Sequence, residues 1–271
     1  MKALIYVNKE KDASNTWCNQ LKKSLTDYNI DYSLLSDEDL KKNISADVIF
    51  VLGGDGTILY LSEFANANGI PIIGINAGKI GFLTEFEKDE TELAVKTLKE
   101  NLLIAEKRIA LISEINGEKF VALNDCVIQR IYDEKNVGII ASIKITIDNV
   151  DIADINGDGI IISTPTGSTA YSLSAGGAIL APGINALSLT PISAHTLSQR
   201  PIIYSADSKL VAKINTGSVA GLYIDGKFIQ KLYENNEVIV SKSKTPIVFL
   251  RRKTTNFYKK VVKKLASTEK D

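Results

Sequence analysis

An apolar run that ends in a glycine turn most constrains how this chain can fold. Residues 48–52 read Val-Ile-Phe-Val-Leu, and Gly53-Gly54-Asp55-Gly56-Thr57 follows at once. Apolar residues then recur at helical spacing from 57 to 67. Glycines allow a ligand close to the backbone, and the start of a helix offers unpaired N–H groups and a positive dipole end. We therefore predict a strand–turn–helix unit whose turn suits a phosphate group.

Asp55 is the unexpected member of this turn. A carboxylate at a phosphate-binding turn is repelled by its ligand unless a metal ion or a proton transfer makes use of it. The alternative is an ordinary tight turn in which Asp55 only caps the helix. The residues of the turn alone leave both interpretations open.

The turn fits neither of two common nucleotide-binding motifs. Gly78-Lys79 is followed by Ile80, so a Walker A loop is absent. Counting on from Gly54 and Gly56, the third glycine of a dinucleotide fingerprint falls on Leu59. The sequence therefore predicts a phosphate turn of another kind.

The order of predicted elements indicates two domains. Strands expected at 4–7, 32–35, 47–52 and 71–75 alternate with helices, including 57–67 and 90–101, which predicts a Rossmann-like parallel sheet. After residue 109, short β-branched runs predict a mainly β domain, interrupted by a helix at 167–178. The runs are separated by dipeptides that predict turns: Asn116-Gly117, Asp148-Asn149, Asn156-Gly157 and Asp225-Gly226. We expect an α/β domain at 1–100, joined by the tail 250–271, and a β-rich domain at 101–249. The tail helix, 257–265, is expected to pack back on the first domain.

Bulk composition narrows the function classes. Thirty-two basic residues balance thirty-two acidic ones, so no overall charge favours nucleic acid or an anionic membrane. The apolar runs are too short for a membrane span, and no signal peptide is recognisable. We expect a soluble, cytoplasmic protein in which Cys18 and Cys126 are buried free thiols. His195, the only histidine, is expected to be structural, and the basic face of the tail helix to be simply solvated.

A second hydroxyl-rich segment runs from Gly157 to Tyr171, Gly-Asp-Gly-Ile-Ile-Ile-Ser-Thr-Pro-Thr-Gly-Ser-Thr-Ala-Tyr. Hydroxyl and amide groups at the start of a helix can bind phosphate or ribose oxygens, and Tyr171 is suited to stack on a base. The alternative is a capped helix with a core tyrosine.

Several segments together resemble the NAD kinase family. The run 53–57 looks like the signature of the superfamily of NAD kinases, diacylglycerol-type lipid kinases and phosphofructokinases. The segments 74–85, 122–125, 157–177 and 190–201 resemble NAD kinases in particular, in the family's order. This resemblance implies ATP-dependent phosphorylation of the 2′-hydroxyl of the adenosine ribose of NAD, which gives NADP. A lipid kinase of the same superfamily and a non-catalytic nucleotide sensor are the alternatives.

The resemblance also implies roles for individual residues. Asp55 would be the general base, within hydrogen-bond reach of the ribose hydroxyl. It implies NAD and ATP as ligands, a divalent cation (Mg²⁺) that accompanies ATP, no metal site made of protein ligands alone, and a homo-oligomer (dimer or tetramer). The implied nucleotide-binding residues are Gly56, Phe82, Asn124, Asp125, Asn156, Asp158, Thr166, Thr169, Ala170, Tyr171, Ser174 and Ser193.

Two residues depart from the family pattern. Asp125 stands where many members have Glu, and Asn156 stands where a basic residue is frequent. Lys79 offers a positive charge near the turn, or is only a solvated loop residue. The choice between ATP and polyphosphate, and the acceptance of NADH, are left open by the sequence.

Overall fold

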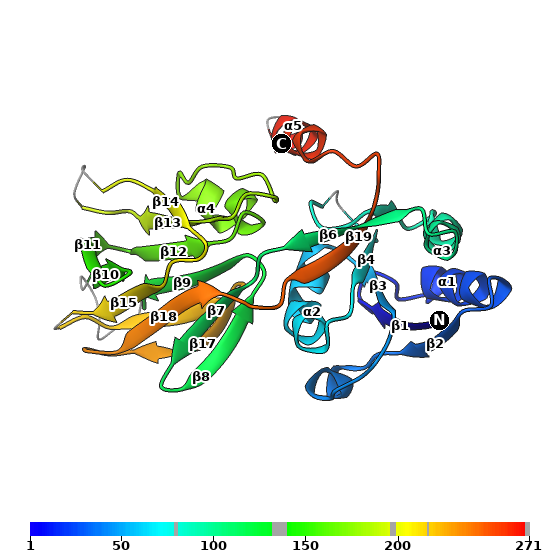
Figure 1. The fold of residues 1–271 in the computed structure, drawn as a ribbon, viewed down its shortest axis with the longest axis horizontal. Coiled ribbons are helices and arrows are strands. Elements are labelled where there is room, and N and C mark those ends of the chain that lie inside the picture. Colours follow the sequence, from blue (N-terminus) through cyan, green and yellow to red (C-terminus); the bar gives the residue numbers. More distant parts are fainter. Residues whose placement is uncertain (79–80, 132–139, 196–198, 216, 269–271) are drawn as a thin grey trace. The chain divides into compact units, whose positions relative to one another are not determined.

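The computed structural model describes residues 1–78, 81–131, 140–195, 199–215 and 217–268. The chain forms two compact units (Figure 1). Unit 1 consists of Met1–Lys107 and Ile247–Asp271, and unit 2 is Arg108–Pro246. Unit 1 is therefore built from both ends of the chain, and unit 2 is one continuous segment. The boundaries expected from the sequence were 100/101 and 249/250.

Unit 1 contains a seven-stranded sheet in the order β2-β1-β3-β4-β19-β6, with the short β5 also paired to β4. Neighbouring strands from β2 to β19 run parallel, which confirms the Rossmann-like sheet. β19 comes from the end of the chain and lies between β4 and β6. The strands are β1 Lys2–Val7, β2 Asp31–Leu34, β3 Val48–Gly53, β4 Ile72–Asn76, β5 Phe86–Glu87, β6 Leu103–Arg108 and β19 Ile247–Arg252.

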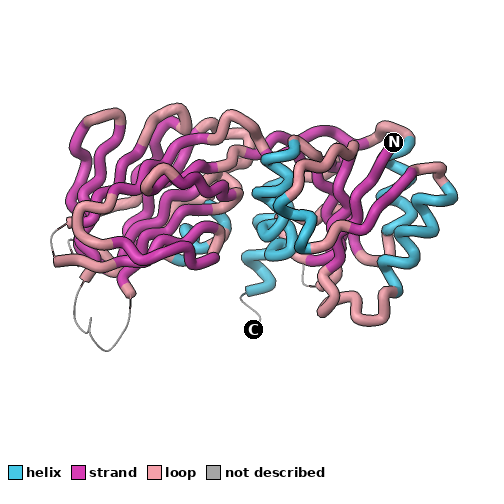
Figure 2. The backbone as a smooth tube through the Cα atoms, turned by 90° about the horizontal axis from the view of Figure 1, so that it is seen from below, coloured by secondary structure: helices cyan, strands magenta, loops and turns pink. Residues whose placement is uncertain are grey.

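Helices lie on both sides of this sheet (Figure 2). Because side chains alternate along a strand, Phe50 and Leu52 of β3 pack in one core with Leu21 of one helix and Val95 of another. On the other face, a Cβ at Gly74 would lie 2.7 Å from Cδ1 of Ile58, so α2 packs tightly on β4. The helices are α1 Thr16–Asp27, α2 Asp55–Asn68, α3 Thr91–Lys99 and α5 Phe257–Thr268, with a 3₁₀ turn η1 at Asp37–Lys41.

Unit 2 is mainly β, as the sequence predicted, and it contains two antiparallel six-stranded sheets. Their orders are β11-β10-β15-β18-β7-β8 and β14-β13-β12-β9-β16-β17. Ile143 of the first sheet and Ile128 and Ile160 of the second belong to one shared core. The strands are β7 Leu111–Ile115, β8 Glu118–Ala122, β9 Asp125–Arg130, β10 Ala141–Ile147, β11 Val150–Gly157, β12 Gly159–Ser163, β13 Ala186–Ile192, β14 Ile202–Ser205, β15 Leu210–Ile214, β16 Ala220–Ile224, β17 Lys227–Leu232 and β18 Glu237–Lys242.

The turn dipeptides that the sequence singled out behave differently from one another. Asn116-Gly117, Asp148-Asn149 and Asp225-Gly226 have positive φ at both residues and connect paired strands, as hairpin turns require. The expected turn at Asn156-Gly157 is wrong. Both residues lie in β11, where Asn156 is paired with Ser142.

The helix predicted at 167–178 is also wrong in length. The segment contains only a 3₁₀ turn η2, Gly167–Thr169, and one helical turn α4, Tyr171–Ser174. Ala170 breaks the path with φ −106° and ψ −127°, and Gly176 ends it with φ 84°. The two glycines at 176 and 177 therefore outweigh the helical pattern that precedes them.

Other expectations concern single features. Cys18 and Cys126 are free and buried, as predicted. Within the described residues, none of the helices is both long and apolar enough to cross a membrane. The tail helix α5 belongs to unit 1, as predicted, and Phe257 at its start lies 6.5 Å from Phe82 between ring centroids.

Candidate functional site

The glycine turn lies where β3 ends and α2 begins, in unit 1. Gly54 is the N-cap residue, and Asp55 is the first residue of α2. Thr57 closes the turn, because its Oγ1 accepts hydrogen bonds from Gly54 N–H (3.4 Å) and from the Asn8 side chain (3.2 Å). A Cβ at Gly53 would lie 2.3 Å from the same oxygen, so glycine is required there. The exposed Gly56 follows in the first turn of α2.

The Asp55 carboxylate is held from outside its own helix. Phe82 N–H donates to Oδ2 at 2.8 Å, and Leu83 N–H donates to Oδ1 at 3.0 Å. A Cβ at Gly81 would lie 2.0 Å from Oδ1, so the chain approaches Asp55 as closely as glycine permits. The interpretation of Asp55 as a plain helix cap is therefore wrong. Its side chain is 27% exposed and is oriented by two backbone donors.

Two lysines that the sequence did not single out lie at this turn. A Cβ at Gly54 would lie 2.7 Å from Nζ of Lys11, and one at Gly78 3.1 Å from it. Lys264 of α5 places Nζ 4.0 Å from Oδ2 of Asp55. Lys11 follows β1 just as the glycine turn follows β3, and carboxyl ends of parallel strands meet at one edge of a sheet. The place of Lys11 just after β1 could therefore have indicated this lysine from the sequence. No pattern near Lys264 in the sequence indicated that it lies beside Asp55. Lys79 lies outside the described residues.

In unit 2, Asn124 and Asp125 form a corner at the start of β9. The Asp225 carboxylate accepts the N–H groups of Leu123 (2.8 Å), Asn124 (2.7 Å) and Asp125 (3.0 Å). Burial, and then the charge of Asp225, raises the pKa of Asp125 to about 7. The sequence identified Asp225 only as a turn residue, although it is what shapes this corner.

The hydroxyl-rich turn packs against the same corner. Thr164 N–H donates to Asn124 O at 2.9 Å, and a Cβ at Gly167 would lie 2.2 Å from that oxygen. Thr166 is buried and accepts a hydrogen bond from Arg108 Nη1 at 3.1 Å. We call this set the carboxyl-end group, because it lies past the carboxyl end of β12; its members are Asn124, Asp125, Thr166, Thr169, Ala170, Tyr171 and Ser174.

Tyr171 and its neighbours are more accessible than a core would be. Tyr171 is 38% exposed, so the alternative of a core tyrosine is wrong. Ser174 is exposed, and Thr169 and Ala170 are half-buried. The Thr169 hydroxyl donates to Thr166 O at 3.2 Å.

The three remaining predicted residues lie at the opposite end of β12. Asp158 pairs with Arg130 Nε at 2.8 Å, and Asn156 O accepts the His195 N–H at 2.9 Å. A Cβ at Gly157 would lie 2.8 Å from Ser193 O, so these segments touch. We call Asn156, Asp158 and Ser193 the amino-end group. The five residues of β12 separate it from the carboxyl-end group by roughly 16 Å.

Comparison with known proteins identifies the family of this chain. The family described as the ATP-NAD kinase N-terminal domain matches residues 5–102, and the ATP-NAD kinase C-terminal domain matches residues 124–252. This chain belongs to the NAD kinase family. A relative named NAD kinase, from Clostridium perfringens, is 36% identical over 276 residues and covers 98% of each chain. One from Methanothermobacter thermautotrophicus is 38% identical over 229 residues, 84% of this chain and 79% of that one.

Solved structures share the NAD kinase fold. A yeast NADH kinase complexed with NADH has a TM-score of 0.82 at 24% identity, over 98% of this chain and 87% of that chain. An NAD kinase from Archaeoglobus fulgidus in complex with ATP has a TM-score of 0.80 at 24% identity, over 98% of this chain and 99% of that chain. At this identity the likeness establishes the two-unit fold of the family.

Proposed function

We propose that this chain transfers the γ-phosphoryl group of ATP to the 2′-hydroxyl of the adenosine ribose of NAD, giving NADP and ADP. The observation that carries the proposal is the Asp55 carboxylate, which the Phe82 and Leu83 amides orient at the glycine turn. In the step, Asp55 takes the hydroxyl proton, a bond forms between the ribose oxygen and the γ-phosphorus, and the bond from that phosphorus to ADP breaks. Membership of the NAD kinase family supports the substrates.

Unit 1 would bind the phosphates. Gly56 and the first turn of α2 supply N–H groups, and Lys11 supplies a cation close to Gly54 and Gly78. Phe82, half-buried beside Asp55, would border the adenine.

Unit 2 would bind the nucleoside through the carboxyl-end group. The Asn124 side chain and the hydroxyls of Thr166 and Thr169 are hydrogen-bonding groups for ribose and base, and Tyr171 offers an exposed ring for stacking. A ribose or base that binds the carboxyl-end group does not also contact the amino-end group, because the five residues of β12 lie between the two groups. We also propose a homo-oligomer in which the amino-end group of one copy contacts the ligand of a second copy.

A divalent cation such as Mg²⁺ fits the residues present if it arrives with ATP. Within the described residues, no three His, Cys, Asp or Glu side chains lie close enough to hold a metal ion by themselves. Mg²⁺ commonly uses one or two carboxylates, with phosphate oxygens and water as its other ligands. Asp55 is the carboxylate that would face it, and the cation would neutralise phosphate charge. We also propose a cytoplasmic location for the protein. The two free buried cysteines support it, because free thiols are typical of a reducing compartment.

A coupled assay tests the activity. The protein is incubated with NAD, Mg²⁺ and ATP, and NADP is detected with an NADP-specific dehydrogenase; parallel reactions contain polyphosphate or NADH. We expect NADP with ATP and NAD. Phosphate appearing on a diacylglycerol or sphingoid base in place of NADP would contradict the proposal, as would tight NADP binding without turnover with any donor.

Asp55→Asn is the first variant for this assay. Removing the base should lower kcat by roughly 10²–10⁴-fold while the Kd for NAD stays near the wild-type value. Asn also offers only one acceptor oxygen to the two amides of Phe82 and Leu83, so about 1–2 kcal/mol of stability should be lost. Equilibrium dialysis and thermal unfolding separate the two effects. Wild-type turnover in this variant would exclude Asp55 as the base.

A further inference from the structure

The C-terminal helix α5 brings a cation to the Asp55 carboxylate. Nζ of Lys264 lies 4.0 Å from Oδ2 of Asp55 and 4.3 Å from the centroid of the Phe82 ring. Lys264 is 40% exposed, so its ammonium is accessible from solvent while it faces the carboxylate. Phe82 therefore has a second role beside the one expected from the sequence, because its ring supports this ammonium.

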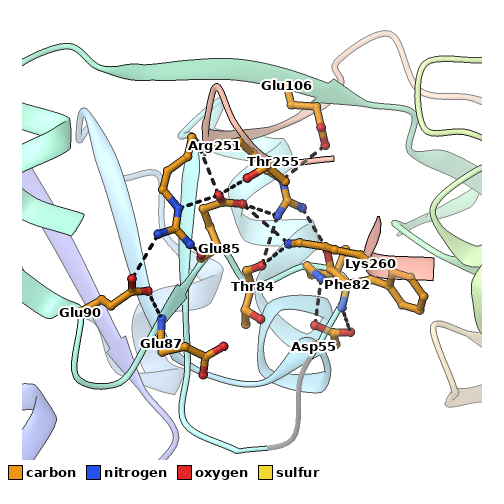
Figure 3. Close-up of polar contacts among 12 residues, drawn as sticks. Asp55, Phe82, Thr84, Glu85, Glu87, Glu90, Glu106, Arg251, Thr255 and Lys260 are labelled. Carbon is orange, nitrogen blue, oxygen red and sulfur yellow. Dashed lines mark hydrogen bonds and ion pairs between the residues drawn. The ribbon is translucent and has the colours of Figure 1, made fainter. Parts of the chain in front are cut away.

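α5 is anchored to the segment that orients Asp55. Lys260 donates to Thr84 O at 2.7 Å and lies 3.7 Å from Oε2 of Glu85, and Figure 3 shows it reaching this segment beside Phe82. Phe257 packs on Phe82 one helical turn earlier. Since residues four apart lie on one face of a helix, anchoring Lys260 directs Lys264 toward the same segment. The position of Lys264 thus follows from fixed neighbours.

The chain that leads into α5 is fixed at the same place. The side chains of Glu85 and Arg251 are each 2% exposed and pair at 3.2 Å (Figure 3). The Glu85 carboxylate also accepts hydrogen bonds from Thr255 and Arg252. Arg251 Nη2 donates to Phe82 O at 3.3 Å. Segment 82–85 therefore holds Asp55 through its N–H groups and the C-terminal segment through its oxygens. This arrangement links α5 to Asp55 through a single segment.

We propose that Lys264 is a catalytic residue that stabilises the transferred phosphoryl group, an inference that rests on the proposed function. In the resting protein its ammonium is balanced by Asp55. When Asp55 takes the ribose proton it becomes neutral, so its attraction for Lys264 is lost as negative charge arrives on the neighbouring phosphoryl oxygens. The flexible lysine stem lets Nζ follow that charge, and a cation placed where charge develops lowers the barrier. No proton leaves Lys264 in this step.

Lys264 and Lys11 have separate positions in unit 1. Lys11 lies against Gly54 and Gly78, whereas Lys264 lies against Asp55 and Phe82. Lys11 is placed to bind phosphates in the ground state, so its loss should raise KM for ATP. Lys264 is placed beside the reacting oxygen, so its loss should lower kcat.

The test compares Lys264→Met with Lys263→Met. Lys263 is the exposed neighbour on the same helix, so the control has the same substitution and net charge. For Lys264→Met we expect kcat to fall about 100-fold, with the Kd for NAD, the KM for ATP and the Tm close to those of Lys263→Met. Lys264→Arg keeps the cation and should recover most of the lost rate.

The possible results distinguish a failure of the proposed NAD kinase activity from a failure of the role proposed for Lys264. Absence of NADP formation by the wild-type protein would contradict the proposed function itself. With an active wild type, equal kcat in Lys264→Met and Lys263→Met would overturn the role of Lys264. A raised KM with unchanged kcat would overturn it too, since it would make Lys264 a ground-state ligand. A Tm drop with no loss of kcat per folded molecule would show a structural residue only.

Discussion

At the scale of single residues, the site depends on how closely backbone approaches carboxylate. Gly81 precedes the two amides that hold Asp55, and any side chain there meets Oδ1 directly. The sequence shows Gly81 only as one glycine of several, because the neighbour that makes it necessary is Asp55, at a distance along the chain. The sequence shows that residue 81 is glycine, but it does not show that contact with Asp55 requires a glycine there.

Gly81→Ala tests this close approach. A Cβ would lie 2.0 Å from Oδ1 of Asp55, so the carboxylate must move. Since a shift of about 1 Å in a reacting group can cost roughly 100-fold in rate, we expect kcat to fall by about that factor. Gly183→Ala is the matched control, because a Cβ there meets no atom within 4 Å. Steady-state kinetics with equal kcat for both variants would show that Asp55 tolerates displacement.

Asp125 should make stability depend on pH. Burial and Asp225 raise its pKa to about 7, so the folded state binds a proton that the unfolded chain releases at about pH 4. The free energy of unfolding should therefore decrease as pH rises from about 4 to 7, by about 4 kcal/mol if this group acts alone. Asp125→Asn cannot ionise and should remove this slope. Urea unfolding of both proteins at several pH values measures it, and parallel pH profiles would contradict the assignment.

At the scale of elements, segment 82–85 and strand β19 are joined by the Glu85–Arg251 pair. The sequence predicted the strand at 71–75 and the tail helix, but no pattern indicated that Arg251 meets Glu85. Their pairing requires β19 to enter the sheet beside β4, a long-range event that local periodicity does not contain. The helix predicted at 167–178 is too long for the same reason, because local periodicity does not contain the path that the chain takes at Ala170 and Gly176.

Arg251→Met tests this coupling. It leaves the buried Glu85 carboxylate without its equally buried partner, so the free energy of unfolding should fall by about 3–5 kcal/mol. Glu85→Gln combined with Arg251→Met removes both charges and should recover part of the loss. Urea denaturation measures the cycle. Strictly additive effects of the two substitutions would show that the pair is not energetically coupled.

At the scale of the whole molecule, unit 2 is an insertion into unit 1. Residues 108–246 are continuous and have their own core, whereas unit 1 needs 247–271 to supply β19 between β4 and β6. The two ends of unit 2 are joined, because Ser243 N–H donates to Ala110 O at 2.8 Å.

Fragments test this organisation. A fragment of residues 108–246 should fold alone, with a cooperative thermal transition, because its core and both sheets are complete. A fragment of residues 1–107 should remain largely unfolded, since its sheet lacks a central strand. Adding a peptide of residues 247–271 should restore its circular dichroism. A cooperative transition in 1–107 without the peptide would contradict the role of β19.

The sequence by itself determined the strand–turn–helix around Asp55, the β-rich second half and the family, because these depend on local spacing and on motifs in order. Only the tertiary structure decided what holds Asp55, that Asp225 shapes the corner at Asn124, and that Lys11 and Lys264 lie at the turn. It also divided the predicted nucleotide-binding residues between the two ends of β12. The physical reason is the separation along the sequence. Strand and turn patterns depend on residues a few positions apart, whereas these contacts form only after strands distant in sequence have paired.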